Sequence, residues 1–323
     1  MSDLPKQIQV NEEGPREGFQ FERGPIPTTR KIELIDSLSE TGLNQIQVAS
    51  FVNPKNVPGM ADADGVVAGF KRKPGILYTG LWLNEKGLQR ALASGRLDVK
   101  GSLSVTASEV FLKRNQNRTA AQDIDAERGI ARMYKQHNVP VSRISIRAAF
   151  GCNYQGDIPT GNVVKMIGDL IRMAVEESFT IKLVSLADTM AWATPAGVKR
   201  LVGAVREAYP DLTIALHLHD TRGMGIANAY AGMEMGVSIF DSSVAGLGGC
   251  PFAGHKGAAG NVCTEDLVFM CDEMGIKTGV DLEKLIVSAR LAEDVVGHPL
   301  PGSVMRGGSL AALRAGIRAG AAA

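Results

Sequence analysis

The chain is 323 residues long, and its 35 basic and 34 acidic residues leave a formal net charge of +1. This balance argues against broad electrostatic binding to nucleic acid or to a membrane surface, and no segment approaches the roughly 18 uninterrupted apolar residues of a membrane span. Four cysteines are too few for a disulfide framework in a chain of this length. The first nine residues carry charges and no apolar core, unlike a signal peptide. We therefore expect a cytoplasmic enzyme whose cysteines are reduced.

Short β-rich runs alternate with longer amphipathic stretches along the chain. We predict strands at residues 7–10, 45–51, 76–81, 97–105, 144–150, 181–186, 213–219 and 238–244, and helices that include 28–40, 121–137, 161–177, 196–208 and 224–235. Ile32, Ile35 and Leu38 recur at steps of three on one helical face. Thr194 followed by Pro195 is typical of a helix start.

Eight strands that alternate with helices predict parallel pairing, and eight is the number that closes a (β/α)8 TIM barrel. The alternative is a doubly wound open sheet, which would want a glycine-rich phosphate turn after its first strand. Residues 11–16, NEEGPR, do not form such a turn. We therefore predict an α/β TIM-barrel domain at residues 1–280. Residues 281–323 are expected to complete the same domain with a helix and a flexible tail.

The active site of a TIM barrel lies at the carboxyl ends of its strands. Polar residues that end or follow the predicted strands are therefore the first functional candidates. They include Arg16, Glu17, Gln47, Arg147, Asp188, Thr189, His217, His219, Cys250 and Asn261.

His217 and His219 are the sharpest of these signals. Side chains two residues apart on a strand point to the same side, so the two imidazoles can bind one divalent metal. A pair of hydrogen-bonded structural histidines explains the same spacing equally well. A carboxylate and an amide from other strand ends would complete a site of nitrogen and oxygen ligands, which favours Mg²⁺ or Mn²⁺ over a thiolate-bound zinc.

Three further candidates have both a functional and a structural explanation: Arg16, Glu17 and Cys250. The arginine could stabilise a developing oxyanion and the glutamate could supply a metal ligand, although a surface ion pair is the commoner fate of such a dipeptide. Cys250 ends the glycine-dense segment 246–250, where its thiol could transfer a proton or could pack as a small apolar side chain.

Four segments resemble motifs of the 3-hydroxy-3-methylglutaryl-CoA lyase family, which belongs to the metal-dependent lyases and synthases on TIM barrels. They are residues 10–20, VNEEGPREGFQ; residues 50–55, SFVNPK; residues 217–221, HLHDT; and residues 242–251, SSVAGLGGCP. The resemblance runs in order from about residue 8 to about residue 290. It implies a carbon–carbon lyase that cleaves a 3-hydroxyacyl-CoA, foremost 3-hydroxy-3-methylglutaryl-CoA, to acetyl-CoA and acetoacetate. It also suggests a homodimer.

By position, the resemblance implies a divalent cation, Mg²⁺ or Mn²⁺, held by Glu17, His217, His219 and Asn261. Three consecutive residues resemble a loop that meets the CoA moiety in the family; they are Lys113, Arg114 and Asn115.

The same resemblance assigns catalytic roles. Arg16 would neutralise the thioester oxygen as an enolate forms, and His217 would take the proton of the tertiary hydroxyl. Cys250 would act in proton transfer to the acetyl-CoA enolate, and Asp188 matches a family aspartate at the end of the sixth strand.

Two positions near the predicted metal site depart from the family pattern. Glu17 stands where the family has Asp, and Gln47 stands where it has Glu. The longer acid at position 17 could compensate for the carboxylate lost at position 47, or both changes could be drift. Because this carboxylate is lost, a second hypothesis is that the chain is a catalytically silent homologue that binds metal or CoA.

Two further departures concern the acyl pocket, in which we also place Gln47 and Thr189. Trp192 and Arg147 replace small residues of the family at strand ends. Trp192 would reshape the pocket and Arg147 could pair with a second carboxylate, although both could equally serve packing. A lyase or synthase for a different hydroxyacyl-CoA, such as a citramalyl-like thioester, is therefore the alternative.

Overall fold

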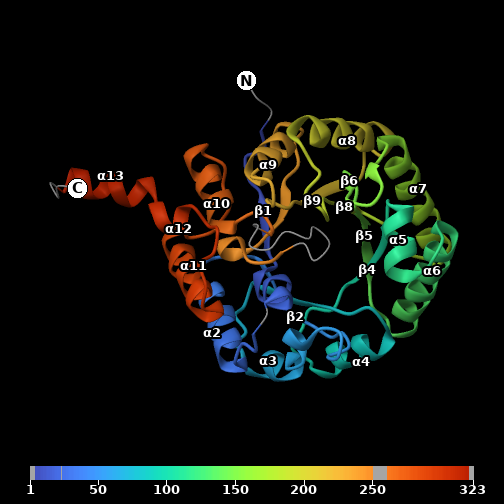
Figure 1. Cartoon of the computed structure of the whole chain (residues 1–323), viewed down its shortest axis with the longest axis horizontal. Coiled ribbons are helices and arrows are strands. Elements are labelled where there is room, and N and C mark those ends of the chain that lie inside the picture. Colours follow the sequence, from blue (N-terminus) through green and yellow to red (C-terminus); the bar gives the residue numbers. More distant parts are fainter. Residues whose placement is uncertain (1–3, 23, 250–259, 320–323) are drawn as a thin grey trace.

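Eight parallel strands curl into one sheet in the computed structural model, which describes residues 4–22, 24–249 and 260–319. The hydrogen-bonded order of the strands is β3-β2-β1-β10-β9-β8-β5-β4, and helices surround the sheet (Figure 1). The strands are β1 (Gln9–Glu12), β2 (Gln45–Ser50), β3 (Leu77–Leu81), β4 (Gly101–Thr106), β5 (Val141–Arg147), β8 (Leu183–Ala187), β9 (Thr213–His217) and β10 (Ile239–Ser242). This arrangement confirms the predicted TIM-barrel architecture.

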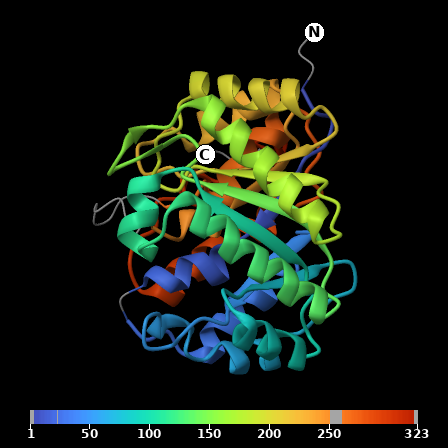
Figure 2. The ribbon, with the colours of Figure 1, turned by 90° about the vertical axis from the view of Figure 1, so that its right-hand side faces the viewer.

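The helices that follow the strands cover the outer face of the sheet, as α5, α6 and α7 do in Figure 2. They are α2 (Thr28–Leu38), α3 (Ala63–Gly69), α4 (Glu85–Ala93), α5 (Glu109–Gln116), α6 (Ala120–Gln136), α7 (Thr160–Glu176), α8 (Pro195–Ala208), α9 (Gly225–Glu234) and α10 (Thr264–Glu273). Shorter elements are η1 (Gly14–Gly18), α1 (Phe19–Phe21), η2 (Pro58–Met60), η3 (Val244–Gly246) and the hairpin of β6 (Gly151–Cys152) with β7 (Gly156–Asp157). None of the described helices is long and apolar enough to cross a membrane.

The local sequence explains where these helices begin and which face they bury. Thr194 caps α8, since its side chain accepts a hydrogen bond from the Gly197 N–H, and Pro195 follows as the first helical residue. On α2, Ile35 and Leu38 are fully buried against the barrel. Removing one such side chain from water stabilises the fold by about 1.5–3 kcal/mol.

The barrel wall has a seam between β3 and β4, which lie at the two ends of the strand order. Backbone and side-chain hydrogen bonds span this seam. The Asp98 N–H donates to the Tyr78 carbonyl (2.8 Å), and the Tyr78 N–H donates to the Asp98 carboxylate (2.8 Å). Glu127 of α6 accepts a hydrogen bond from the Ser104 N–H on β4 (2.7 Å). Backbone groups at the strand edge thus make hydrogen bonds although β3 and β4 do not pair as neighbouring strands.

Three helices follow the barrel at the C-terminal end: α11 (Leu282–Val296), α12 (Val304–Gly307) and α13 (Leu310–Arg318). The Ser37 and Ser288 hydroxyls bond at 2.7 Å and join α2 to α11. In Figure 1, α13 extends away from the barrel, and the guanidinium of Arg314 donates two hydrogen bonds to Glu273 of α10 (2.8 and 2.7 Å).

Candidate metal centre at the carboxyl ends of the strands

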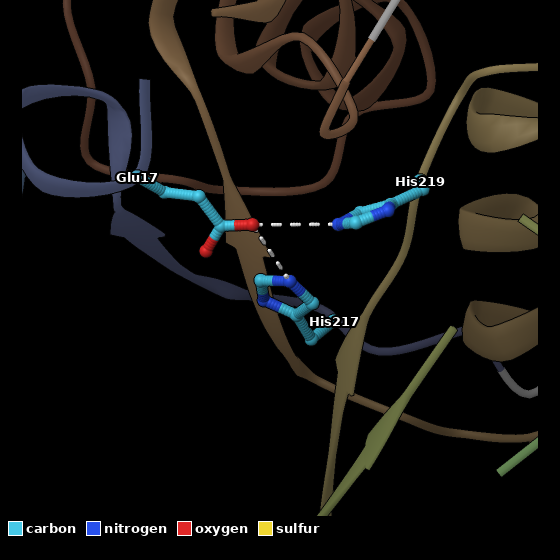
Figure 3. Close-up of side chains that lie close together, drawn as sticks. All are labelled: Glu17, His217 and His219. Atoms are coloured by element: carbon cyan, nitrogen blue, oxygen red, sulfur yellow. Dashed lines mark ion pairs between the residues drawn. The ribbon is translucent and has the colours of Figure 1, made fainter. Parts of the chain in front are cut away.

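Glu17, His217 and His219 converge at the carboxyl ends of β1 and β9. Oε1 of Glu17 lies 3.6 Å from Nε2 of His217 and 3.4 Å from Nε2 of His219 (Figure 3). One ligand atom from each residue lies within 4.8 Å of the other two. One carboxylate oxygen and two imidazole nitrogens therefore face a common point, as the sequence predicts and as a divalent metal requires.

Unsatisfied buried atoms beside this point fit a metal ion as well. His219 and Asn261 are 5% and 2% exposed, yet apart from the 3.4 Å contact of His219 with Glu17 their side-chain polar atoms have no hydrogen-bond partner within the described parts of the chain. Buried polar groups are nearly always hydrogen-bonded, so these atoms indicate a ligand. A backbone bridge places the two residues side by side. The donor set that could hold a cation therefore comprises one carboxylate, two imidazoles and one amide oxygen.

Asp241 on β10 orients the His217 ring. Oδ2 of Asp241 lies 3.4 Å from Nδ1 of His217 and accepts a hydrogen bond from Arg143 (3.0 Å). Its Oδ1 accepts a hydrogen bond from Asn11 (2.8 Å). Burial opposes ionisation of Asp241, but Arg143 and His217 outweigh it and hold the pKa of this carboxyl below its usual range. With Nδ1 engaged, Nε2 of His217 faces Glu17, which is how an outer carboxylate commonly fixes a metal-binding histidine.

The charge of His217 depends on the same neighbours. Burial disfavours the imidazolium, but the carboxylates of Glu17 and Asp241 outweigh that penalty and raise the pKa of His217 to about 10. Burial likewise opposes ionisation of Glu17, but Arg16 and His217 hold its pKa well below the usual range. Without a cation, the site is thus a buried imidazolium between two carboxylates.

Arg16 lies beside this cluster with its guanidinium bonded on three sides. Nη1 lies 2.9 Å from Oε2 of Glu17, Nε donates to Oε1 of Gln47, and Nη2 donates to Oε2 of Glu13. Arg16, Glu17 and Gln47 therefore lie together as the sequence predicts. Glu13 was not among the predicted site residues, although the family-like motif contains it three positions before Arg16.

Asp188 directly follows β8 and is fully buried. Its Oδ1 accepts hydrogen bonds from the backbone N–H groups of Trp192 (2.7 Å) and Ala193 (3.0 Å), whereas Oδ2 has no partner in the described structure. Burial raises the pKa of Asp188, and the neighbouring imidazole of His219 opposes that shift. Asp188 therefore both shapes the turn after β8 and adds a buried carboxylate near the candidate metal centre.

The residues predicted for the acyl pocket make contacts with the barrel wall. The Trp192 indole N–H donates to Oδ1 of Asn153 (2.7 Å), and its ring packs against a cluster that includes Met190. Thr189 Oγ1 accepts a hydrogen bond from the Ala148 N–H (2.9 Å). Nη2 of Arg147 lies 3.5 Å from the carbonyl of Ser104, and its Nε is buried without a partner in the described residues.

The three residues predicted to meet coenzyme A lie elsewhere. Lys113, Arg114 and Asn115 are exposed near the end of α5. The guanidinium of Arg114 lies 4.7 Å from the centre of the Tyr154 ring, within the range of a cation–π contact. Cys250 lies outside the described residues.

The fold and this site define a class of protein, an α/β barrel with a candidate divalent-metal centre at the carboxyl ends of its strands. Comparison with known families narrows the class. The HMGL-like family model matches residues 7–292, which is most of the chain. The chain belongs to the HMGL-like family.

Curated and solved relatives agree with this assignment. A mitochondrial hydroxymethylglutaryl-CoA lyase of Mus musculus is 42% identical over 286 residues, 88% of this chain and 85% of that protein. A hydroxymethylglutaryl-CoA lyase of Bacillus subtilis is 38% identical over 297 residues, 92% of this chain and 96% of that protein. An HMG-CoA lyase of Acinetobacter baumannii, solved with coenzyme A and 3-methylmalate, superposes with a TM-score of 0.83 at 36% identity, covering 96% of this chain and 97% of that one.

Proposed function

We propose that this chain is a metal-dependent lyase that cleaves 3-hydroxy-3-methylglutaryl-CoA to acetyl-CoA and acetoacetate. The observation that carries the proposal is the buried convergence of Glu17, His217 and His219 at the strand ends. It occurs in a chain 42% identical to a curated lyase of that name over 88% of its length. The solved relative with coenzyme A supports an acyl-CoA as the substrate class.

Glu17, His217, His219 and Asn261 are the proposed ligands of the cation. Oxygen and imidazole ligands without a thiolate favour Mg²⁺ or Mn²⁺. The chemistry that a divalent cation supplies here, when bound, is to lower the pKa of the substrate's tertiary hydroxyl, as it lowers that of bound water.

His217 is the proposed acceptor of the proton from that hydroxyl. Its Nδ1 faces Asp241, so Nε2 carries the one available lone pair. Metal ligation and proton acceptance are therefore alternative roles for this atom, and His217 acts as the proton acceptor only when Nε2 is not bound to the cation. Arg16 is the proposed stabiliser of the enolate. A guanidinium has five N–H donors, and three of its nitrogens already have one partner each, which leaves donors for the thioester oxygen. A donor preorganised in this way stabilises charge as it develops in the transition state.

Cys250 is the proposed proton donor to the enolate, on the strength of the motif at residues 242–251. The orphaned Oδ2 of Asp188 suits a supporting role close to His219. Exposed cations on α5 suit the phosphates of coenzyme A; these are Lys113 and Arg114, with Asn115 beside them. A homodimer is proposed from the family resemblance alone.

A lyase for a different 3-hydroxyacyl-CoA is the second candidate. The observation that favours it is the unpartnered buried Nε of Arg147, which could meet a further carboxylate of an acyl group. Gln47, Thr189 and Trp192 are the other residues proposed to shape the acyl pocket.

Acetyl-CoA release by purified protein tests the function. The protein is stripped with EDTA, reloaded with Mg²⁺ or Mn²⁺, and given 3-hydroxy-3-methylglutaryl-CoA or citramalyl-CoA in parallel. We expect metal-dependent release from the first substrate at an ordinary enzymatic rate, for which the median is about 10 s⁻¹. Release from citramalyl-CoA alone would move the assignment to the second candidate. Release from neither, by folded and metal-loaded protein, would contradict both.

A further inference from the structure

We propose that Glu13 is the positioning residue for Arg16 and supplies the negative charge that Gln47 does not. The inference deepens the proposed function, since it concerns the residue assigned to the enolate. It replaces the idea that Glu17 compensates for position 47. Glu13 and Gln47 flank the same guanidinium, and of the two only Glu13 can carry a charge.

The contacts of Arg16 divide between two kinds of partner. Gln47 accepts from Nε with a neutral amide oxygen, which fixes direction but offers no charge. Glu13 accepts from Nη2 with a carboxylate and is 4% exposed. Both hydrogen bonds are charge-assisted by the guanidinium, but only the bond to Glu13 joins opposite charges, so Glu13 is the partner that fixes where the Nη2 end of the guanidinium lies.

Glu17 cannot fill this role alone because its carboxylate is shared. Oε2 of Glu17 lies 2.9 Å from Nη1 of Arg16, whereas Oε1 faces His217 and His219. A cation held by Glu17, His217 and His219 would be attracted by the same Glu17 carboxylate, and it would repel the guanidinium of Arg16 nearby. Arg16 then needs a counter-charge of its own, since a buried ion without a partner is strongly destabilising.

The turn after β1 explains how Glu13 reaches Arg16. The backbone carbonyl of Glu13 accepts from the N–H groups of Arg16 (3.1 Å) and Glu17 (2.7 Å). This turn places the two side chains three residues apart on one helical face, where neighbouring charges meet. Glu13 therefore holds the turn through its carbonyl and the guanidinium through its carboxylate.

A charge-relocation series tests the proposal. Glu13→Gln removes the charge and keeps the shape, and Glu13→Gln with Gln47→Glu returns a carboxylate to the other side of Arg16. Glu22→Gln is the matched control, because Glu22 belongs to the same segment but bonds His298 at 2.7 Å. We expect Glu13→Gln to lower kcat about 10²-fold, the order associated with a misplaced catalytic group, with little change in KM. The double variant should recover most of that loss, and the control should match wild type.

A second readout does not depend on turnover. In ¹⁵N-arginine-labelled protein, the guanidinium N–H signal of Arg16, assigned by its disappearance in Arg16→Lys, reports whether the group is held, at Nη2 by Glu13 and at Nε by residue 47. Its exchange with water should be slow in wild type, faster in Glu13→Gln and slow again in the double variant. If wild type fails to cleave 3-hydroxy-3-methylglutaryl-CoA, the proposed function fails while this measurement still tests the position of Arg16.

Two results would overturn the proposal: wild-type exchange in Glu13→Gln, or a folded double variant that recovers neither exchange nor kcat. Should Glu13→Gln not fold, Glu13→Asp replaces it, with and without Gln47→Glu. The shorter acid draws the carboxylate back from Nη2, so we expect a partial loss that Gln47→Glu repairs. Absence of that loss would contradict the role of Glu13.

Discussion

Binding of a divalent cation at the strand ends should release a proton from His217. The affinity for the cation should therefore depend on pH. Glu17 and Asp241 outweigh the burial penalty and raise the pKa of His217 to about 10 in the metal-free protein. An imidazole must be neutral to ligate a metal. At neutral pH the cation therefore competes with a proton for Nε2 of His217.

The size of the effect follows from that pKa. At pH 7 the imidazole lies about three pH units below its pKa, and each unit is worth 1.36 kcal/mol, so removal of the proton costs about 4 kcal/mol of binding free energy. Below the pKa of His217 this cost falls as pH rises. The dissociation constant for Mn²⁺ should therefore tighten about tenfold per pH unit between pH 6.5 and pH 8.5.

Isothermal titration calorimetry of Mn²⁺ in two buffers of different ionisation enthalpy measures both quantities. We expect about one proton released per bound ion at pH 7.5. Asp241→Asn is the comparison variant, because it removes one of the two carboxylates that favour the imidazolium and should flatten the pH dependence at the upper end. A dissociation constant independent of pH, with no proton released, would refute this account of His217.

Three further predictions concern single residues. His219→Ala should empty the metal site, and full metal occupancy by elemental analysis would contradict the assignment. Cys250→Ser should lose most of its turnover while it keeps its metal, and retained turnover would remove the thiol from the mechanism. Glu12→Gln should be more stable relative to wild type at pH 8 than at pH 5, as measured by the free energy of unfolding. Burial raises the pKa of Glu12 to about 7, so wild type loses up to about 3 kcal/mol as pH rises from 4.5 through 7. Urea unfolding at both pH values measures the difference, and an equal difference at both would be inconsistent with this pKa.

The sequence predicted the barrel well because its signals are local. The strand expected at residues 181–186 is β8 (Leu183–Ala187), and each of the eight strands lies at or overlaps its expected place. The strand expected at 97–105 begins only at Gly101, because Asp98 bonds across the seam to Tyr78 instead of pairing along β5. The β6–β7 hairpin has two residues per strand, too few for an alternating pattern.

The candidate metal centre was predictable for a different reason. Parallel strands in a barrel bring their carboxyl ends together, so Glu17, His217 and His219 meet although 200 residues separate the first from the second. The contact of Glu13 with Arg16 was not predicted, because it depends on the tight turn after β1. The contact of Trp192 with Asn153 depends on the missed hairpin.

The central claim is that carbon–carbon cleavage depends on a cation at Glu17, His217 and His219. Titration of the metal-stripped protein with Mn²⁺, with bound ion followed by electron paramagnetic resonance and acetyl-CoA release followed in the same samples, tests it most directly. We predict that both signals rise together, reach their maximum at one Mn²⁺ per chain, and are lost together in His219→Ala. Release of acetyl-CoA by the stripped protein at the full rate, or by His219→Ala without bound Mn²⁺, would contradict the account.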